Sequence, residues 1–341
     1  PWLYDMIFPM EAKLTGEDIY HLSKLAFLEY LTSGISACFD MYYFPEDMAR
    51  ASVDFGFRTV MTCGLNNFKE SIEKLEEYYN KFNNYNELIS YQLGFHAEYT
   101  TSRELLEGIS ALAQKYKAPV FTHSSETESE VAECIERYGK TPTALFEELG
   151  LFNYGGGAYH SVWVNDNDLE IYKKRGVYAV INAGSNSKLA SGIAPVSKMI
   201  DKGIPLAIGT DGPSSNNALD MFREMYLISA TQKLKDKNAA STDANKILEM
   251  ATVGSAKCMG LDNCDIIDKG KTADLIVLDL NRPNMHPINN ITKNIVYSGS
   301  KENVKLTMIN GKILYENGEF VGIDTDEIYR NAQKITDRIK G

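Results

Sequence analysis

The sequence predicts an α/β fold in which parallel strands and helices alternate around a (β/α)8 barrel, with the first strand apparently absent from the chain. Two observations lead to this fold class. Seven apolar segments of strand length alternate with segments of helical period between residues 35 and 210, and such alternation is typical of parallel sheets. Four of the segments also end in a histidine or an aspartate, and a barrel gathers that many strand ends at one mouth.

The expected strands are short and rich in apolar, β-branched and aromatic residues. They cover residues 35–43, 57–63, 91–96, 119–123, 157–160, 177–182 and 205–210. An open doubly wound sheet fits the same alternation, but it brings together only a few strand tips at its switch point. Because seven strands are one fewer than the barrel needs, and the chain begins abruptly at Pro1, we expect the missing strand to lie upstream. Its absence would leave an exposed strand edge.

The expected helices lie between these strands and carry apolar residues at a spacing close to 3.6. They run from Thr15 to Gly34 and over 45–56, 66–85, 102–117, 127–138, 141–149, 167–175 and 195–201. Thr15 and Asp18 have the spacing of a capping box, which marks where the first of these helices begins.

After residue 258 the pattern changes to short strands, which we expect at 273–280, 294–297, 304–310 and 312–315. Asn310-Gly311 between the last two predicts a two-residue hairpin turn. A final surface helix is expected from Asp326 to Ile339. The chain therefore divides into a barrel with strands 2 to 8 (1–258), a partial β-rich appendage (259–325) and a C-terminal helix (326–341).

The composition is that of an acidic globular protein, with 44% hydrophobic and 24% charged residues and a net charge of -11. This charge argues against a nucleic-acid-binding surface, and no apolar run is long enough for a membrane span. The five cysteines are scattered without a C-x-x-C pair, as in a reducing compartment with free thiols. The composition predicts an acidic, compact cytoplasmic protein. We expect its partner to be a small-molecule substrate rather than a nucleic acid or a membrane, with a homo-oligomer as one option for its assembly.

The polar strand ends carry residues suited to metal-assisted hydrolysis. His123 and Asp211 are ligands for a divalent ion such as zinc or iron, and such an ion lowers the pKa of bound water to about 7. Glu126, on the turn after His123, is placed to pass a proton to a substrate nitrogen. His160 could orient the water, and Asp211 could accept its proton. Each residue alone would be an ordinary cap or turn residue, so the predicted hydrolytic deamination rests on their shared position.

Segments along nearly the whole chain resemble, in order, the motifs of the amidohydrolase superfamily. They are Pro9–Thr15, His96–Thr100, His123–Thr127, Ser185–Pro195, Gly209–Phe222 and Gly270–Leu275. The run Gly209-Thr210-Asp211-Gly212-Pro213-Ser214-Ser215-Asn216-Asn217 is similar to the eighth-strand motif. More narrowly, the pattern resembles the 5'-methylthioadenosine/S-adenosylhomocysteine deaminase family of the chlorohydrolase-like group.

This resemblance implies one divalent metal ion, most commonly Zn2+ with Fe2+ as the alternative. Its implied ligands are His123, Asp211 and an H-x-H pair on the first strand, which would lie upstream of residue 1. It further implies that Glu126 and Asp211 meet the substrate base, that His96 contacts the nucleoside, and that Trp2 lies near the adenosine pocket. The strands after residue 265 would form half of a β-sandwich whose other half precedes the barrel.

The sequence departs from the family pattern around this pocket. The changes are the absence of any H-x-H, Tyr159-His160-Ser161 for A-H-C, His96-Ala97-Glu98-Tyr99 for H-A-P-Y, Ile181-Asn182-Ala183 for H-N-P, and Cys63 for an arginine. Since half of the implied metal ligands are missing, we expect weak or no metal occupancy in this chain.

The leading hypothesis is a metal-dependent deaminase of an adenine nucleoside such as methylthioadenosine, S-adenosylhomocysteine or adenosine. One alternative keeps the same machinery and changes the ring to guanine, cytosine or an s-triazine. Another is a non-catalytic binding protein on a decayed barrel, because a fold does not guarantee a function. The zinc deaminases with an H-x-E and P-C-x-x-C signature are disfavoured, since that pattern is missing.

Overall fold

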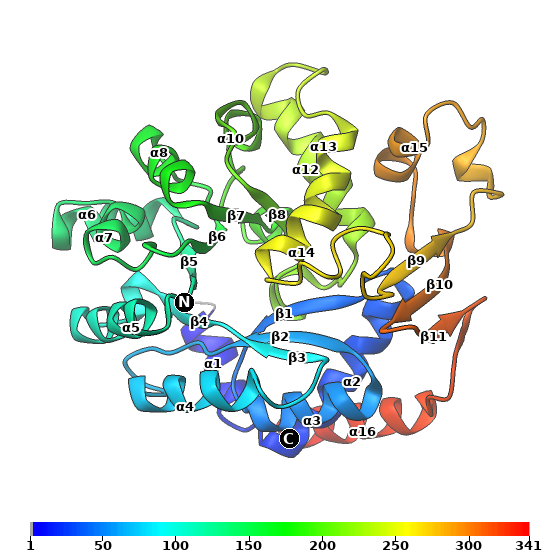
Figure 1. Ribbon diagram of the computed structural model, residues 1–341, viewed down its shortest axis with the longest axis horizontal. Coiled ribbons are helices and arrows are strands. Elements are labelled where there is room, and N and C mark those ends of the chain that lie inside the picture. Colours follow the sequence, from blue (N-terminus) through cyan, green and yellow to red (C-terminus); the bar gives the residue numbers. More distant parts are fainter. Residues whose placement is uncertain (1–2, 341) are drawn as a thin grey trace.

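The computed structural model describes residues 3–340, in which strands and helices alternate as expected (Figure 1). All seven predicted strands of the alternating region are present. They are β1 (Ala37–Met41), β2 (Arg58–Thr62), β3 (Ile89–Tyr91) with β4 (Leu93–Ala97), β5 (Val120–Ser124), β6 (Gly156–His160), β7 (Val177–Ile181) and β8 (Leu206–Ile208). Every pairing among them is parallel.

The third predicted strand is divided into two because it serves two sheets. Its first part, β3, pairs with β2, and its second part, β4, pairs with β5. The strands therefore form one sheet of order β1-β2-β3 and another of order β4-β5-β6-β7-β8, in chain order throughout. Gln92 joins the two parts and donates its backbone N–H to the Met61 carbonyl at 2.8 Å.

The succession of strands ends at β1 and at β8 without closing. Within residues 3–340, β1 pairs only with β2 and β8 pairs only with β7. The parallel α/β plan of the prediction is thus confirmed, whereas closure into a (β/α)8 barrel stays a prediction.

The predicted helices are also present, with ends shifted by a few residues. They are α2 (Gly16–Thr32), α3 (Pro45–Phe55), α4 (Ile72–Phe82), α5 (Arg103–Tyr116), α6 (Glu128–Tyr138), α7 (Pro142–Glu148), α8 (Asp166–Arg175) and α10 (Val196–Lys202). Thr15 and Asp18 form the expected capping box at the start of α2. In the described part of the chain, no helix combines the length and the apolar character required to cross a membrane.

Further helical segments follow the ends of the strands or connect them. They are η1 (Leu3–Ile7), α1 (Phe8–Glu11), η2 (Glu98–Thr100), α9 (Ala183–Lys188), α11 (Pro213–Asn216), α12 (Met221–Asp236), α13 (Ala244–Glu249), η3 (Met250–Gly254) and α14 (Ser255–Cys258). Of these, α9 follows β7 and α11 follows β8, so both lie at the strand ends where polar residues were expected. The longest, α12, packs against α9.

Apolar and aromatic side chains fill the space beneath the strand ends. Phe121 and Tyr159 belong to one cluster with Phe39, Val180, Ala207 and Cys258. The rings of Phe39 and Phe121 lie 4.6 Å apart between centroids. This packed layer supports the polar residues at the mouth from below.

The C-terminal part forms a small antiparallel sheet of order β12-β11-β10-β9. Its strands are β9 (Leu275–Leu278), β10 (Val304–Ile309), β11 (Lys312–Glu316) and β12 (Glu319–Phe320). The short helices η4 (Pro283–Met285) and η5 (Lys301–Asn303) lie between β9 and β10. Asn310 and Gly311 both have positive φ, +50° and +77°, which confirms the predicted hairpin turn.

One predicted strand, 294–297, is wrong, because the segment belongs to helix α15 (Ile291–Tyr297). The Asn290 side chain caps this helix by accepting the Lys293 N–H at 2.9 Å. Ile291 and Ile295 are four residues apart, the spacing of one helix face, and α15 packs against α12 and α13.

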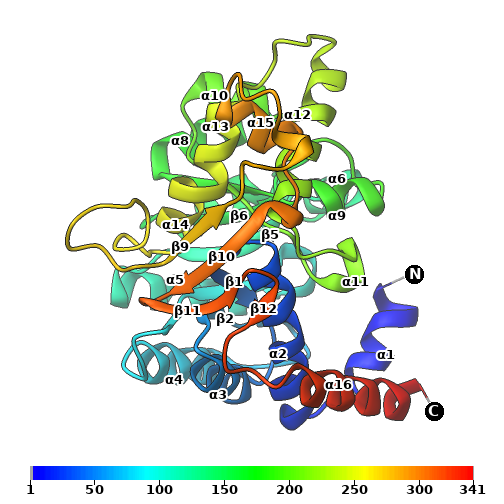
Figure 2. The same ribbon diagram turned by 90° about the vertical axis from the view of Figure 1, so that its right-hand side faces the viewer.

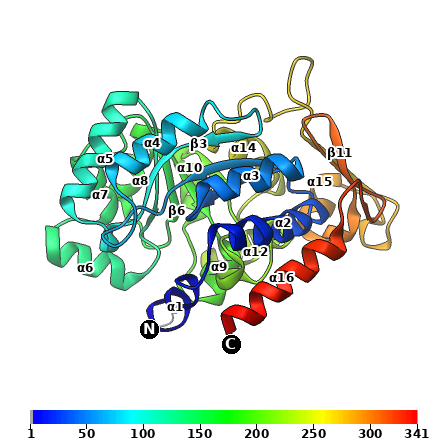
Figure 3. The same cartoon turned by 90° about the horizontal axis from the view of Figure 1, so that it is seen from below.

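The last helix, α16 (Thr325–Lys340), confirms the predicted surface helix and lies along α2 (Figures 2 and 3). It buries Ile328, Ala332 and Ile335. The small sheet is joined to the same region, since the Thr307 hydroxyl donates to the Leu31 carbonyl at 2.8 Å. The division into three parts at residues 258 and 325 stays a prediction.

Candidate functional site

The predicted site residues at the strand ends do come together. His160 is the last residue of β6, and His96 and His123 are the last but one of the neighbouring strands β4 and β5. The His96 and His123 ring centroids are 5.0 Å apart, and those of His123 and His160 are 5.5 Å apart. Asp211, just beyond β8, is close enough for its charge to act on both His123 and His160.

His123 is held in one tautomer by the neighbouring strand. Its Nδ1 lies 2.6 Å from the His96 backbone carbonyl, and because a carbonyl can only accept, Nδ1 carries the proton. Burial lowers the pKa of His123, and the nearby His160 adds to this effect. The neutral ring therefore keeps a lone pair on Nε2, the arrangement typical of a histidine metal ligand.

Asp211 is oriented by two donors. The Ser185 hydroxyl donates to Oδ2 at 2.6 Å, and the Gly212 N–H donates to Oδ1 at 2.5 Å. Burial opposes ionisation, but the charge of His160 and these hydrogen bonds outweigh it, so the pKa of Asp211 is lowered. Asp211 has a φ of +57°, a strained conformation of the kind found at functional sites.

Glu126 occupies a turn that other groups stabilise. The buried Glu130 carboxylate accepts the N–H groups of Ser125 and Glu126 at 2.9 and 2.7 Å. The Ser191 hydroxyl donates to Glu126 Oε1 at 3.2 Å. Glu126 Oε2 lies 3.7 Å from His160 Nε2.

His160 lies close to both of these carboxylates. Burial alone would lower its pKa, but Glu126 and Asp211 outweigh burial and raise it. Its Nδ1 is 2.7 Å from Asn186 Oδ1, and this amide oxygen accepts the ring proton. Nε2 then faces Glu126 Oε2 at 3.7 Å, the distance of an ion pair rather than of a hydrogen bond.

His96 is a neutral histidine beside the others. Thr100 donates its hydroxyl proton to the Ala97 carbonyl at 3.1 Å, so its oxygen accepts from His96 Nδ1 at 2.9 Å. Burial, reinforced by His123 and His160, lowers the pKa of His96 to about 3. Its Nε2 is therefore available as an acceptor for a substrate hydroxyl.

Trp2, the remaining predicted substrate contact, lies outside the described residues. Ser185, Asn186 and Ser191 were not assigned a role from the sequence. They belong to the segment after β7 that carries part of the family resemblance. Its several small polar residues are the one feature of the sequence that points to hydrogen-bonding roles there. Their partners lie 26 to 65 residues away in the chain, so only the fold reveals what they bind.

The described residues fit a metal ion in part. His123 presents an unprotonated nitrogen and Asp211 an ionised carboxylate, the states that metal binding requires. Within residues 3–340, however, no three His, Cys, Asp or Glu side chains are grouped so that they could hold an ion. The remaining donors would have to come from other residues, as the predicted upstream H-x-H pair would supply.

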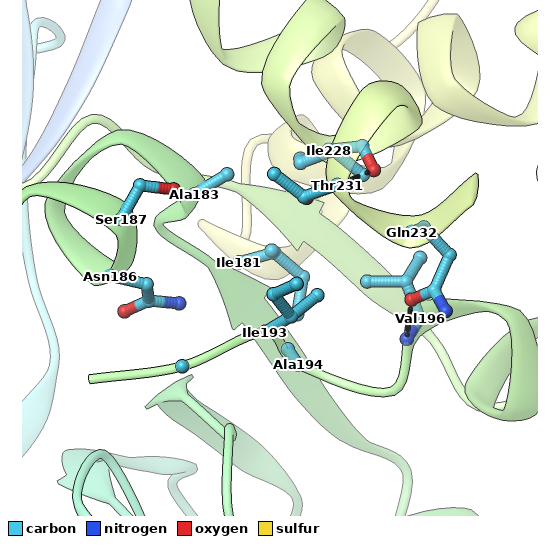
Figure 4. A pocket seen from close by; sticks show the side chains of 11 residues that line it. Ile181, Ala183, Asn186, Ser187, Ile193, Ala194, Val196, Ile228, Thr231 and Gln232 are labelled. Atoms are coloured by element: carbon cyan, nitrogen blue, oxygen red, sulfur yellow. Dashed lines mark hydrogen bonds between the residues drawn. The ribbon is translucent and has the colours of Figure 1, made fainter. Parts of the chain in front are cut away.

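A small hollow lies between the segment after β7 and helix α12 (Figure 4). Its lining is mainly apolar and includes Ile181, Ile193, Ala194 and Ile228. It shares Asn186 with the site, but none of the predicted catalytic residues lines it.

The comparisons agree with this geometry. A sequence model described as the amidohydrolase family matches residues 2–314. A 5-methylthioadenosine/S-adenosylhomocysteine deaminase of Caldanaerobacter subterraneus subsp. tengcongensis is 39% identical, covering 98% of this chain and 79% of that protein. A 5'-deoxyadenosine deaminase of Methanopyrus kandleri is 37% identical, covering 99% of this chain and 80% of that protein.

Solved structures show the same fold. An adenosine deaminase from Xanthomonas campestris with bound zinc is 31% identical, with a TM-score of 0.95 over 99% of this chain and 79% of that chain. An atrazine chlorohydrolase from Arthrobacter aurescens, complexed with zinc, has a TM-score of 0.87 at 20% identity, over 98% of this chain and 79% of that chain. At that identity, the second match supports the fold alone.

Proposed function

Because this chain belongs to the amidohydrolase family, whose members are hydrolases, we propose that it is a metal-dependent deaminase of an adenine nucleoside. One observation carries the proposal: an unprotonated His123 nitrogen and an ionised Asp211 stand beside the Glu126–His160 pair. This arrangement combines metal ligands with a proton carrier. Methylthioadenosine, S-adenosylhomocysteine, adenosine and 5'-deoxyadenosine are the candidate substrates, since these are compounds that the relatives' names contain or imply.

We also propose that the strands belong to a closed (β/α)8 barrel. Its missing strand would run between β1 and β8, which each have one neighbour among the described residues. An H-x-H pair on that strand would complete the metal ligands. The gap between β1 and β8 and the incomplete ligand set point to the same missing element.

When bound to His123 and Asp211, a divalent ion such as zinc would acidify water and supply hydroxide at neutral pH. Glu126 takes the proton from the attacking water and delivers it to the ring nitrogen next to the amino-bearing carbon. His160, beside Glu126, orients the water. Asp211 accepts the second proton of the water, from the hydroxyl on the attacked carbon, and passes it to the amino group. The carbon–nitrogen bond then breaks and the amino group leaves as ammonia, so that one water is consumed for each amine released.

Substrate binding is assigned to residues beside this centre. His96, neutral and with its Nε2 lone pair free, would accept a hydrogen bond from the nucleoside. Glu126, once protonated, donates to the base. Trp2 would contact the adenosine, as the family resemblance implies.

The test is ammonia release from a panel of adenosine, methylthioadenosine, S-adenosylhomocysteine, 5'-deoxyadenosine, guanine and cytosine, in zinc-supplemented protein that includes the upstream segment. We expect release from the adenine nucleosides. Glu126→Gln should retain zinc but lose about 10²–10⁴-fold in kcat. Glu133→Gln, an exposed carboxylate on α6, is the matched control and should keep full activity. Turnover by the Glu126→Gln variant close to that of the control would contradict the assigned role.

A non-catalytic nucleoside-binding protein is the second candidate. It is favoured by the lack of a three-ligand group within the described residues. Calorimetric binding of an adenine nucleoside without ammonia release, in zinc-supplemented protein that includes the upstream segment, would establish this alternative.

A further inference from the structure

Helix α12 carries a buried carboxylate, Glu224, directly behind the candidate site. Glu224 is fully buried. Its Oε2 accepts the Gly184 backbone N–H at 2.9 Å, and its Oε1 accepts from the Asn216 amide at 2.7 Å. Gly184 belongs to α9 after β7, and Asn216 belongs to α11 after β8. One carboxylate therefore joins the segments that follow two neighbouring strands.

Both joined segments hold residues of the site. Next to Gly184, Ser185 donates to Asp211 and Asn186 accepts from His160. The Asn216 amide also donates to the Thr210 carbonyl at 2.7 Å, one residue before Asp211. Glu224 is thus hydrogen-bonded to Gly184, one residue before Ser185 and two residues before Asn186, the groups that orient Asp211 and His160.

The contact at Gly184 is too close for any side chain. A Cβ at this position would lie 2.3 Å from Glu224 Oε1 and 2.6 Å from Asn216 Oδ1, distances that real Cβ atoms do not adopt. The glycine therefore lets the backbone approach the carboxylate closely.

A buried carboxylate is costly when neutral amides are its partners. Burial raises the pKa of Glu224 to about 7, although its hydrogen bonds to Gly184 and Asn216 act in the opposite direction. An apolar residue would avoid this cost, but it would leave the Gly184 N–H and the Asn216 amide without this acceptor, so the carboxylate holds both segments in place.

The same helix offers a built-in comparison. Gln232, eight residues after Glu224, accepts the Val196 N–H at 2.8 Å (Figure 4). Ile228 lies between them at the hollow described above. Glu224 and Gln232 thus secure opposite ends of the segment after β7, but no bond of Gln232 reaches a residue that contacts the site.

We propose that Glu224 is a positioning residue, whose carboxylate sets the segment after β7 against the segment after β8 so that Ser185 and Asn186 orient Asp211 and His160. The effect of Glu224 on turnover rests on the proposed deaminase function, whereas its effect on the orientation of His160 does not.

The test compares Glu224→Gln with Gln232→Met, each nearly the same size as the residue it replaces. Glu224→Gln leaves one of the two donors facing an amide NH2 group. Gln232→Met removes the acceptor of the Val196 N–H and the donor to Asp236. In the metal-free chain, the imidazole 15N resonances of the five histidines report the state of His160 directly. Hydrogen exchange of the peptides around 183–189 and 194–199 reports each anchor.

We expect Glu224→Gln to move the His160 resonances, to leave those of His21 and His286 in place, and to speed exchange at 183–189 about tenfold, the worth of one hydrogen bond. Gln232→Met should speed exchange only at 194–199 and leave His160 unchanged. In active protein, Glu224→Gln should lower kcat about 10–100-fold, as for other outer residues of metal sites, with KM changed less than about threefold.

Unchanged His160 resonances in Glu224→Gln, or equal changes in both variants, would overturn the proposal. If Glu224→Gln fails to fold, Asn216→Ala removes the hydrogen bond between Asn216 and Glu224. This variant must then move the His160 resonances. If the resonances move as expected but the unaltered protein releases no ammonia, the deaminase function fails and the positioning role stands.

Discussion

The buried ion pair between Arg58 and Asp274 gives a quantitative prediction about how the small sheet is attached. Arg58, on β2, is 6% exposed. Its Nη2 lies 3.0 Å from Asp274 Oδ1, and its Nε also donates to Asp274. Its Nη1 donates to the Glu87 carbonyl at 2.9 Å, and the Asn310 N–H donates to Asp274 at 2.7 Å. The pair thereby joins β2 to the hairpin of the C-terminal sheet.

Asp274→Asn removes the negative charge and leaves the guanidinium buried without a counter-ion. Removing one partner of a buried pair costs about 3–5 kcal/mol. For a chain of this size, about 2 °C of melting temperature is lost per kcal/mol, so calorimetry should show a melting temperature lower by roughly 6–10 °C.

Two further variants distinguish the cost of the unpaired, buried Arg58 charge from the small effect of losing a surface ion pair. Arg58→Met combined with Asp274→Asn removes the buried charge as well, and should recover much of the lost stability. Glu17→Gln breaks the exposed pair of Glu17 with Arg50, and it should leave the melting temperature almost unchanged. The reasoning is refuted if Asp274→Asn unfolds no earlier than Glu17→Gln, or if the double variant is no more stable than Asp274→Asn alone.

Three other predictions concern the site. Ser191→Ala removes the hydroxyl that donates to Glu126. The kcat for ammonia release should therefore fall by about 5–10-fold, the contribution of one hydrogen bond. An unchanged kcat would show that Ser191 does not hold Glu126. The pKa of Glu224 is raised from 4.5 to about 7 in the folded protein. The folded state therefore binds more protons than the unfolded state between these two pH values. As a result, the free energy of unfolding should fall as pH rises from about 4.5 to about 7. Urea titrations across that range should show a shallower fall for Glu224→Gln, and equal slopes would contradict the raised pKa. The zinc content measured by elemental analysis should be low in this chain and near one ion per chain in protein with the upstream segment. It should fall sharply in Asp211→Ala. An unchanged zinc content in that variant would exclude Asp211 as a ligand.

The alternation of strands and helices, and the residues at the strand ends, could be predicted from the sequence because their signals are local. A parallel strand is a short apolar run, and its last residue is where a polar side chain can reach the mouth of the sheet. His96, His123, His160 and Asp211 follow from this pattern. The helix α15 was mistaken for a strand because a seven-residue segment rich in Ile and Val is compatible with either structure, and its cap and its packing on α12 decide between them.

What the tertiary structure decided is the chemical state of these residues. His123 presents its Nε2 because the carbonyl of His96, 27 residues earlier, takes the Nδ1 proton. The pKa of His160 is raised because Glu126 and Asp211 lie near it at two other strand ends. Ser185 and Asn186 acquire roles through partners that lie 26 residues away. Glu224 acquires its role through Gly184, 40 residues away, and Asn216, 8 residues away. The sequence determined which side chains stand at the strand ends, whereas protonation and orientation depend on charges and hydrogen bonds between distant segments, and these exist only after the chain has folded.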